Sequence, residues 1–316
     1  MVWFARIVAA VALAVVAWAC LTSWGAVVHG HPAYAVLLVL TAVVAVLVLV
    51  RSLGEPRERS RLRRVLRVVG VVLGVLWVAA IWWLRPFTAV EPALAAMQSD
   101  AEVAVSESAT DIVLAPTSGA TGAGVLFQPG AKVEARAYAA VLRPLAEAGT
   151  TVVIVKQPLS IAFLSLGAFD SARAAHPEVT RWVVGGHSLG GTVAAIEAES
   201  STFDGVEGVA AGLLLYASYP ATNMSDTLGS AVLSISASND ALATPADIDA
   251  SKSNLPPNAE FLVIEGAVHA YFGDYGPQPG DGTPTISHDD ARRQISGASV
   301  DFVARLVIAP PTSPGG

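Results

Sequence analysis

Residues 182–191 read WVVGGHSLGG and continue into TVAAIEAES at 192–200. They contain the pentapeptide G-x-S-x-G, as GHSLG at 186–190. The pentapeptide alone is weak evidence, but here an apolar run precedes it and an Ala-rich run follows it. That order predicts a tight strand–turn–helix connection, which holds the hydroxyl of Ser188 at a helix N-terminus. Ser188 is the predicted nucleophile; the alternative is a serine that only caps the helix.

Short runs rich in Val, Ile and Leu alternate with longer helix-forming runs in the C-terminal two thirds of the chain. The strands are expected at 102–105, 111–115, 124–128, 151–155, 181–185, 209–216, 231–236 and 260–264. The helices are expected at 134–148, 168–176, 189–200, 244–252 and 288–307. Continuous apolar runs suit strands that are buried on both faces. The alternation predicts an α/β fold, a mostly parallel sheet with helices on both faces.

A serine hydroxyl is a weak nucleophile until a base accepts its proton. His269 follows the strand expected at 260–264 on a Gly/Pro-rich loop. Loops at the carboxyl ends of strands carry the functional groups of open α/β sheets, so His269 is the predicted base. The rival is His288, whose SHDD context predicts a solvated residue in a first helical turn. His187 is expected to point away from the hydroxyl and to pack, and His176 to end a helix.

The acid that orients the imidazole should follow a strand between the nucleophile and the base. Asp240 directly follows the strand expected at 231–236. It is predicted to fix the tautomer of the imidazole without itself being protonated. Its alternative role is that of a turn residue, because Asn239-Asp240 is favourable turn chemistry. Asp226 and Asp247 remain alternative acids.

Two backbone N–H groups should stabilise the negative oxygen that forms when a carbonyl is attacked. Each such donor stabilises the transition state by roughly 3 kcal/mol. One is expected to be the N–H of Leu189, directly after the nucleophile. The other should come from QPGAK at 128–132. Pro129 has no N–H, which leaves Gly130 or Ala131, and Ala131 is preferred.

The first 90 residues predict a membrane region. Three apolar runs are each near the length that crosses a hydrocarbon core as a helix; buried helices of a soluble protein are the alternative. The runs are residues 2–28, 33–50 and 68–84. The loop 51–64 holds six arginines, whereas 25–33 holds no Lys or Arg. Because positive loops stay in the cytoplasm, we expect a multi-pass protein of the cell membrane, with its C-terminal domain on the extracytoplasmic side.

The first apolar run has a second interpretation. Ala17-Trp18-Ala19 resembles a small-x-small cleavage site of a signal peptide. Cys20 after it hints at a lipoprotein, although Trp18 fits that poorly. Cleavage would leave the later topology unchanged. Cys20 is the single cysteine, so no intramolecular disulfide can form, and the Cys spacing of a structural zinc site is absent.

Charge divides the chain at the same place as hydropathy. Residues 1–90 carry nine Lys or Arg and two Asp or Glu, whereas residues 91–316 carry ten and twenty-four. The strongly acidic second part argues against nucleic acid as a partner, because phosphate binding relies on clustered Lys and Arg. The expected organisation is a membrane region at 1–90, a linker at 91–101, a catalytic domain at 102–309 and a disordered tail at 310–316.

Residues 124–308 resemble the α/β-hydrolase family, in particular its compact dienelactone-hydrolase-like group. The resemblance rests on QPGAKV (128–133), VVIVKQP (152–158), WVVGGHSLGG (182–191) and HAYFGDYG (269–276). It implies the α/β-hydrolase fold with Ser188 as nucleophile, His269 as base and Asp240 as acid. Dienelactone hydrolases use a cysteine nucleophile, so the serine here speaks against that activity.

The short intervals between strands predict no large lid domain, and 157–168 and 273–287 are expected to shape the pocket. The expected function is hydrolysis of carboxylic esters, small-molecule or lipid, by a membrane-anchored serine hydrolase. No cofactor motif is present, and Asp274, Asp281 and Gly282 lack the spacing of a calcium loop, so neither cofactor nor metal is expected. The alternative is a non-catalytic binding or scaffold domain of the cell envelope. Transport is disfavoured, because the helices lack a buried ionisable pair, and the sequence leaves the oligomeric state open.

Overall fold

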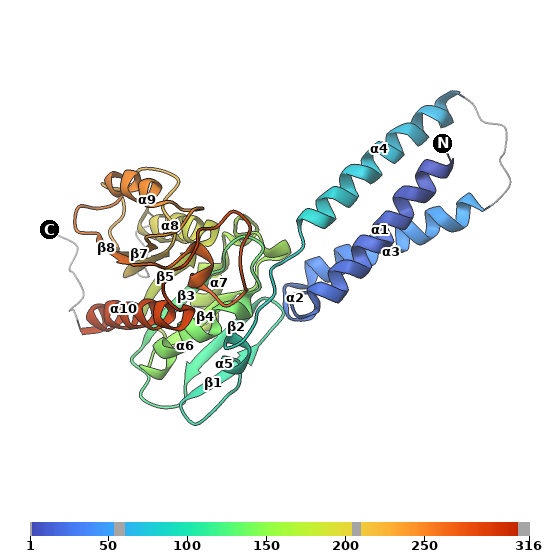
Figure 1. Ribbon diagram of the computed structural model, residues 1–316. Helices are drawn as coiled ribbons and strands as arrows, with labels where there is room; N and C mark the ends of the chain where they lie inside the picture. The colour runs from blue at the N-terminus through green and yellow to red at the C-terminus, as the bar shows by residue number, and fades with distance from the viewer. Residues whose placement is uncertain (1, 54–60, 204–209, 309–316) are drawn as a thin grey trace.

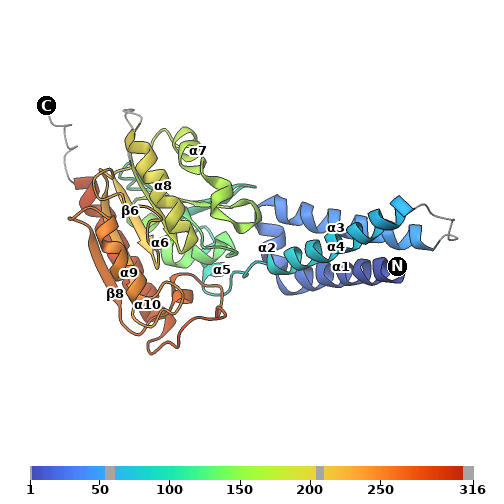
Figure 2. The ribbon, with the colours of Figure 1, turned by 90° about the horizontal axis from the view of Figure 1, so that it is seen from above.

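A computed structural model describes residues 2–53, 61–203 and 210–308. It consists of a bundle of long apolar helices and an α/β domain, and the bundle projects from one side of that domain (Figures 1 and 2). The chain passes from bundle to domain after residue 84, where the last long helix has ended.

Within the described ranges, three helices are long and apolar enough to cross a membrane. They are α1 (Val2–Thr22), α3 (Pro32–Ser52) and α4 (Arg61–Trp83), and α1 packs against both others. The first differs from the single run expected at 2–28, because the helix is interrupted at Ser23 and resumes as α2 (Trp24–His29). The Ser23 hydroxyl donates a hydrogen bond to the carbonyl oxygen of Pro86 (3.1 Å) and accepts one from Arg85 (2.9 Å). Through these two hydrogen bonds, Ser23 connects the bundle to the segment that leads into the domain.

The domain is built on an eight-stranded sheet with the order β1-β2-β4-β3-β5-β6-β7-β8. The strands are β1 (Val103–Glu107), β2 (Asp111–Pro116), β3 (Ala123–Gln128), β4 (Thr151–Val155), β5 (Arg181–His187), β6 (Gly212–Tyr216), β7 (Ala231–Ala237) and β8 (Glu260–Ile264). Strands β3 to β8 run parallel, whereas β2 is antiparallel to both β1 and β4. The prediction of a mostly parallel sheet is confirmed.

Helices cover both faces of this sheet. α6 (Ala139–Glu147) and α10 (His288–Ile308) contribute to the core on one face, and α7 (Ala168–Ala175) and α8 (Leu189–Phe203) to the core on the other. The shorter helices are α5 (Ala93–Ala96), α9 (Pro245–Ser251) and the 3₁₀ turns η1 (Ala135–Tyr138), η2 (Pro158–Ser160), η3 (Ala162–Ser165), η4 (Lys252–Asn254) and η5 (His269–Phe272). The predicted disordered tail at 310–316 lies outside the described residues.

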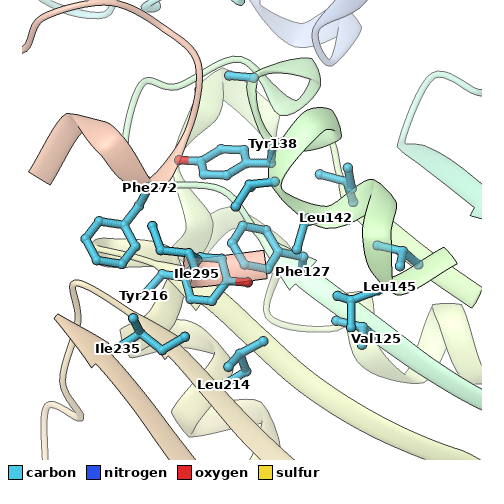
Figure 3. Close-up of a cluster of buried hydrophobic side chains, with 14 of the residues drawn as sticks. Val125, Phe127, Tyr138, Leu142, Leu145, Leu214, Tyr216, Ile235, Phe272 and Ile295 are labelled. Atoms are coloured by element: carbon cyan, nitrogen blue, oxygen red, sulfur yellow. The ribbon is translucent and has the colours of Figure 1, made fainter. Parts of the chain in front are cut away.

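The two cores explain why the central strands read as continuous apolar runs. Successive side chains of a strand point to opposite faces. In β3, Val125 and Phe127 enter the core under α6 and α10, whereas Leu126 enters the core under α7 and α8. Figure 3 shows the first of these cores, where the Phe127 ring lies between Tyr138 and Tyr216, with ring centroids 5.0 and 5.2 Å apart.

The segment that leaves the bundle is held against the loop after β3. The N–H of Phe87 donates to the carbonyl oxygen of Lys132 (2.6 Å), and the N–H of Glu134 donates to that of Phe87 (3.0 Å). The ammonium group of Lys132 in turn donates to the carbonyl oxygen of Trp83 (3.2 Å), the last residue of α4. The carboxyl end of β3 therefore lies next to the bundle.

Candidate active site

Ser188 lies alone between the last residue of β5 and the first residue of α8. Its φ of 53° falls in the left-handed region, which is rare for a residue with a side chain. A Cβ atom at Gly186 would overlap the backbone of Gly190, and one at Gly190 would overlap the backbone of Gln128. The turn is therefore so tight that these two positions require glycine. The side chain of Ser188 is partly exposed at the N-terminus of α8.

His269 begins η5, and Asp240 lies three residues after β7. Nδ1 of His269 is 2.8 Å from Oδ2 of Asp240, and both residues are almost fully buried. The other carboxylate oxygen accepts the backbone N–H groups of Leu242 (2.7 Å) and Ala243 (2.8 Å). A carboxylate can only accept hydrogen bonds, so Nδ1 carries the proton of the imidazole. Nε2 is then left as the basic nitrogen.

Asp281 is a residue of this site that the sequence analysis considered only as a calcium ligand. Its carboxylate accepts the N–H of His269 (3.2 Å), of Ala270 (2.8 Å) and of Gly282 (2.7 Å). The first two N–H groups open the 3₁₀ turn that carries the imidazole. Asp281 therefore holds the backbone of His269 in place from the loop that follows. In the sequence, the one sign of this role is an Asp-Gly pair that follows the histidine. Only the folded loop places Asp281 under η5.

We expect Asp281→Ala to lower kcat by about 10² for any reaction in which His269 acts as the base. The rate falls because the backbone N–H groups at the start of η5 lose the carboxylate that accepts their hydrogen bonds. A displacement of the imidazole by about 1 Å is enough to slow the reaction by this factor. Asp281→Asn keeps one acceptor oxygen and should retain most of the activity. The measurement is kcat of both variants beside Glu265→Ala, an exposed acid of the same region. Equal activity of Asp281→Ala and Glu265→Ala would contradict the positioning role.

The loop after β3 is fixed by a chain of buried hydrogen bonds. The N–H of Gly130 donates to the hydroxyl of Tyr138 (2.9 Å), and that hydroxyl is 2.8 Å from Nδ1 of His187. The Tyr138 hydroxyl therefore bridges the loop after β3 and the side chain of His187, the last residue of β5. Burial raises the pKa of Tyr138 and lowers the pKa of His187, so both groups are neutral. Neither Tyr138 nor its hydrogen bonds could be recognised in the sequence.

These hydrogen bonds show which candidate oxyanion donors still have a free N–H group. The N–H of Gly130 is already used, whereas the N–H groups of Ala131 and Leu189 have no acceptor among the described residues. Leu189 is the first residue of α8, so the helix offers its N–H no partner. Two donors are thus free among the described residues, one at the start of α8 and one in the loop after β3, and these two segments meet where a Cβ at Gly190 would overlap the backbone of Gln128.

The other histidines lie outside the His269–Asp240 pair. His187 is buried, and its ring lies 4.5 Å from that of His269 and 5.8 Å from that of Phe272. His288 begins α10 but is not the solvated residue that we expected. Its ring stacks on Tyr271 at 4.4 Å, and its side chain is only 28% exposed. The stacking follows because η5, which carries Tyr271, packs against α10.

The alternative acids are also accounted for. Asp247 forms a capping box with Thr244 at the start of α9, with their side chains 2.6 Å apart. Asp226 is exposed on the loop between β6 and β7. Among the described residues, Asp240 is the carboxylate that contacts the imidazole of His269. In the same described ranges, no cluster of three or more His, Cys, Asp or Glu is arranged to hold a metal ion.

Glu197 is a buried carboxylate of α8, the helix that begins directly after Ser188. Glu197 of α8 accepts the side-chain amide of Gln128 (3.0 Å) and the N–H of Phe169 (3.3 Å). Gln157 donates to the side chain of Gln128 (3.0 Å) and to the carbonyl oxygen of Pro129 (2.9 Å). The network joins α8 to the loops after β3 and β4. Burial raises the pKa of Glu197 to about 7.

The raised pKa predicts a pH-dependent stability. The folded protein keeps the proton of Glu197 up to about pH 7, whereas the unfolded chain loses it near the ordinary pKa of 4.5. The free energy of unfolding therefore falls between these pH values, by about 3 kcal/mol. We expect Glu197→Gln to remove most of this fall, as measured by denaturant unfolding at pH 5 and pH 8. Glu102→Gln, an exposed control, should leave it intact; the same fall in Glu197→Gln would contradict the assignment.

The model of the alpha/beta hydrolase family matches residues 124–293, more than half of the chain. No curated protein matches. Similar solved structures include a predicted CIB-like hydrolase from Thermoplasma acidophilum, with 14% identity, 64% of this chain and 99% of that chain covered, and a TM-score of 0.48.

Two further solved structures are similar. For a putative dienelactone hydrolase from Klebsiella pneumoniae, the identity is 13%, the coverage is 62% of this chain and 92% of that chain, and the TM-score is 0.48. For an esterase from the Planctomycetes species Thermogutta terrifontis, the identity is 14%, the coverage is 67% and 96%, and the TM-score is 0.45. At such identities the likeness concerns the fold alone.

Proposed function

Because this chain belongs to the alpha/beta hydrolase family, we propose that it is a membrane-anchored serine hydrolase that cleaves carboxylic esters. The observation that carries the proposal is the buried contact between His269 and Asp240, 2.8 Å long, on loops at the carboxyl edge that also presents Ser188. This contact leaves Nε2 of the imidazole basic. A base of that kind is what a serine hydroxyl needs to become a nucleophile.

The proposed reaction is acyl transfer to water. Oγ of Ser188 attacks the ester carbonyl while Nε2 of His269 accepts the hydroxyl proton. The oxygen that becomes negative is stabilised by the free N–H groups of Leu189 and Ala131. His269 then gives its proton to the departing alcohol, and water attacks the acyl-serine with the same histidine as base. Asp240 stabilises the imidazolium in both steps without accepting a proton.

The membrane anchor is proposed to be the bundle of α1, α3 and α4. Each of these helices is long and apolar enough to span a bilayer. The arginines of the segment 51–64 would keep that segment in the cytoplasm. Because the domain follows α4 at the opposite end of the bundle, it would lie on the extracytoplasmic side (Figure 1).

The second candidate function is a non-catalytic binding or scaffold domain. The free N–H groups and the basic nitrogen of His269 favour the enzyme, because a binding domain has no need of them. The two functions are separated by full-length protein in lipid nanodiscs assayed with p-nitrophenyl esters of increasing chain length. The enzyme predicts saturable turnover that an organophosphonate abolishes. A folded protein with neither turnover nor inhibitor reaction would support the binding domain.

A further inference from the structure

The carboxyl edge of the sheet, where the candidate active site lies, is turned towards the helix bundle. The loop after β3 pairs with Phe87, four residues beyond the end of α4. The turn after β4, η2, contacts α3. These two loops are also joined to each other, because the N–H of Lys132 donates to the carbonyl oxygen of Ser160 (2.7 Å). Figure 2 shows the bundle meeting the domain on this side.

The bundle residues that these loops contact indicate how deep the loops would lie in a membrane. Leu159 of η2 packs against the buried cluster of Ala19, Tyr34, Leu38 and Ile81 at the outer ends of the helices. Trp82 and Trp83, the last residues of α4, are more than half exposed. Tryptophan favours the headgroup zone of a bilayer. In a membrane, η2 would therefore lie at the level of the lipid headgroups.

An apolar patch follows η2 directly in the chain. We define it as Phe163, Leu164 and Leu166, which are 45%, 53% and 48% exposed. The surrounding stretch 157–168 contains no charged residue, although the part of the chain from residue 91 onwards is strongly acidic. Leu164 lines a cavity of about 350 Å³ together with His31, the residue that caps the N-terminus of α3. Leu164 of the patch thus lies beside the start of α3, at the end of the bundle that meets the domain.

We propose that the apolar patch inserts into the outer lipid leaflet, and that the substrate is an acyl-ester lipid of that leaflet. The part about substrate rests on the proposed serine hydrolase function. Lipid would cover three large apolar side chains that otherwise face water next to the anchor. Ser188 would then break the bond between acyl carbon and ester oxygen. The alcohol part of the lipid leaves with the proton from His269, and water releases the fatty acid.

Insertion can be measured without any activity. In a Cys20→Ala background, Leu164→Cys carries a nitroxide label in nanodiscs of phosphatidylcholine and phosphatidylglycerol. The matched control is Phe261→Cys on β8, the edge strand farthest from β4 in the sheet, whose side chain is also partly exposed. The proposal predicts that the label at position 164 meets lipid-dissolved oxygen more than a water-soluble nickel chelate, and the control the reverse. Equal exposure of both labels to the chelate would overturn insertion.

Substrate class is tested with the variant Phe163→Ser/Leu164→Ser/Leu166→Ser. The measured quantity is the ratio of two turnover rates, for a fluorogenic diacylglycerophospholipid in phosphatidylcholine vesicles and for p-nitrophenyl acetate in water. We expect this ratio to fall about tenfold or more, because apolar area that holds the site at the lipid is lost. The control pair Phe261→Ser/Val263→Thr should keep the wild-type ratio.

The outcomes separate this proposal from the proposed function. Wild-type turnover of p-nitrophenyl acetate without turnover of the vesicle lipid would overturn the substrate class and leave the hydrolase standing. An unchanged ratio in the triple variant would overturn the role of the patch. Absence of both activities would overturn the hydrolase, while the nitroxide experiment would still decide whether the patch lies in the membrane.

Discussion

Replacing Ser188 by alanine is expected to lower kcat/KM for ester hydrolysis by a factor on the order of 10⁵ or more. The residual rate would come from the oxyanion donors and from binding alone. The variant should fold normally, because alanine keeps a Cβ at the same strained φ and the N–H of residue 188 still donates to Tyr216 (3.0 Å). The measurement is steady-state kinetics with a p-nitrophenyl ester, with thermal unfolding as the check on folding.

The matched control is Ser253→Ala, which removes an exposed hydroxyl of the same domain. It should retain wild-type kcat/KM. A Ser188→Ala variant that keeps more than about one hundredth of the wild-type rate would mean that the hydroxyl is not the nucleophile. The Ser188 turn would then be a helix start in which the serine only caps, the alternative that the motif itself leaves open.

Replacing Asp240 by asparagine is expected to lower kcat by about 10⁴. The asparagine oxygen can still accept the N–H groups of Leu242 and Ala243, so the loop should keep its shape. Its amide group would then face the imidazole of His269 and donate to Nδ1. The proton of the imidazole would move to Nε2, which could no longer accept the proton of the serine hydroxyl.

Asp249→Asn is the control for this variant, because Asp249 is exposed and pairs with Lys252 on the surface. It should leave kcat unchanged, since an exposed ion pair has little energetic weight. A loss of less than tenfold in Asp240→Asn would contradict the role of Asp240 as the orienting acid. An accompanying large drop in the thermal midpoint would instead indicate that Asp240 chiefly holds its turn.

The sheet could be predicted because its signals are local. Each central strand is buried on both faces and reads as an apolar run, and the glycines of the turn at Ser188 follow from the contacts that a Cβ would make there. The contact between Asp240 and His269 could be anticipated from chain order, since both follow strands that end at one edge of a parallel sheet. To predict these features, it is enough to know the sequence of one segment or the order of several segments along the chain.

Other parts of the site depend on segments that are distant in the sequence. Tyr138 reaches Gly130 and His187 because its ring packs on Phe127 near the end of β3. Glu197 meets Gln128 where α8 packs against β3. The contact of Asp281 with the backbone of His269 forms only when the loop after η5 folds back under that turn. Such buried polar contacts produce no periodicity of hydropathy and no characteristic residue spacing in the sequence, so they could not be predicted from it.

The expected linker at 91–101 illustrates the same limit. Sequence composition marked the passage from bundle to domain, but the structure shows that the preceding residues are already part of the domain. Phe87 pairs with the loop after β3, and Thr88 and Ala89 donate to the carboxylate of Glu134 (2.6 and 2.9 Å). The helix bundle is thereby joined to the loop that carries Ala131. Hydropathy alone cannot reveal such pairing, because it depends on backbone hydrogen bonds.

The central claim is that Ser188 is an activated nucleophile, and covalent trapping tests it most directly. Full-length protein in nanodiscs would be treated with a fluorophosphonate, digested and mapped by mass spectrometry, beside Ser188→Ala. The account predicts one phosphonylated serine, Ser188, and no adduct in the variant. A folded wild-type protein that stays unmodified, or one modified at another serine, would contradict it.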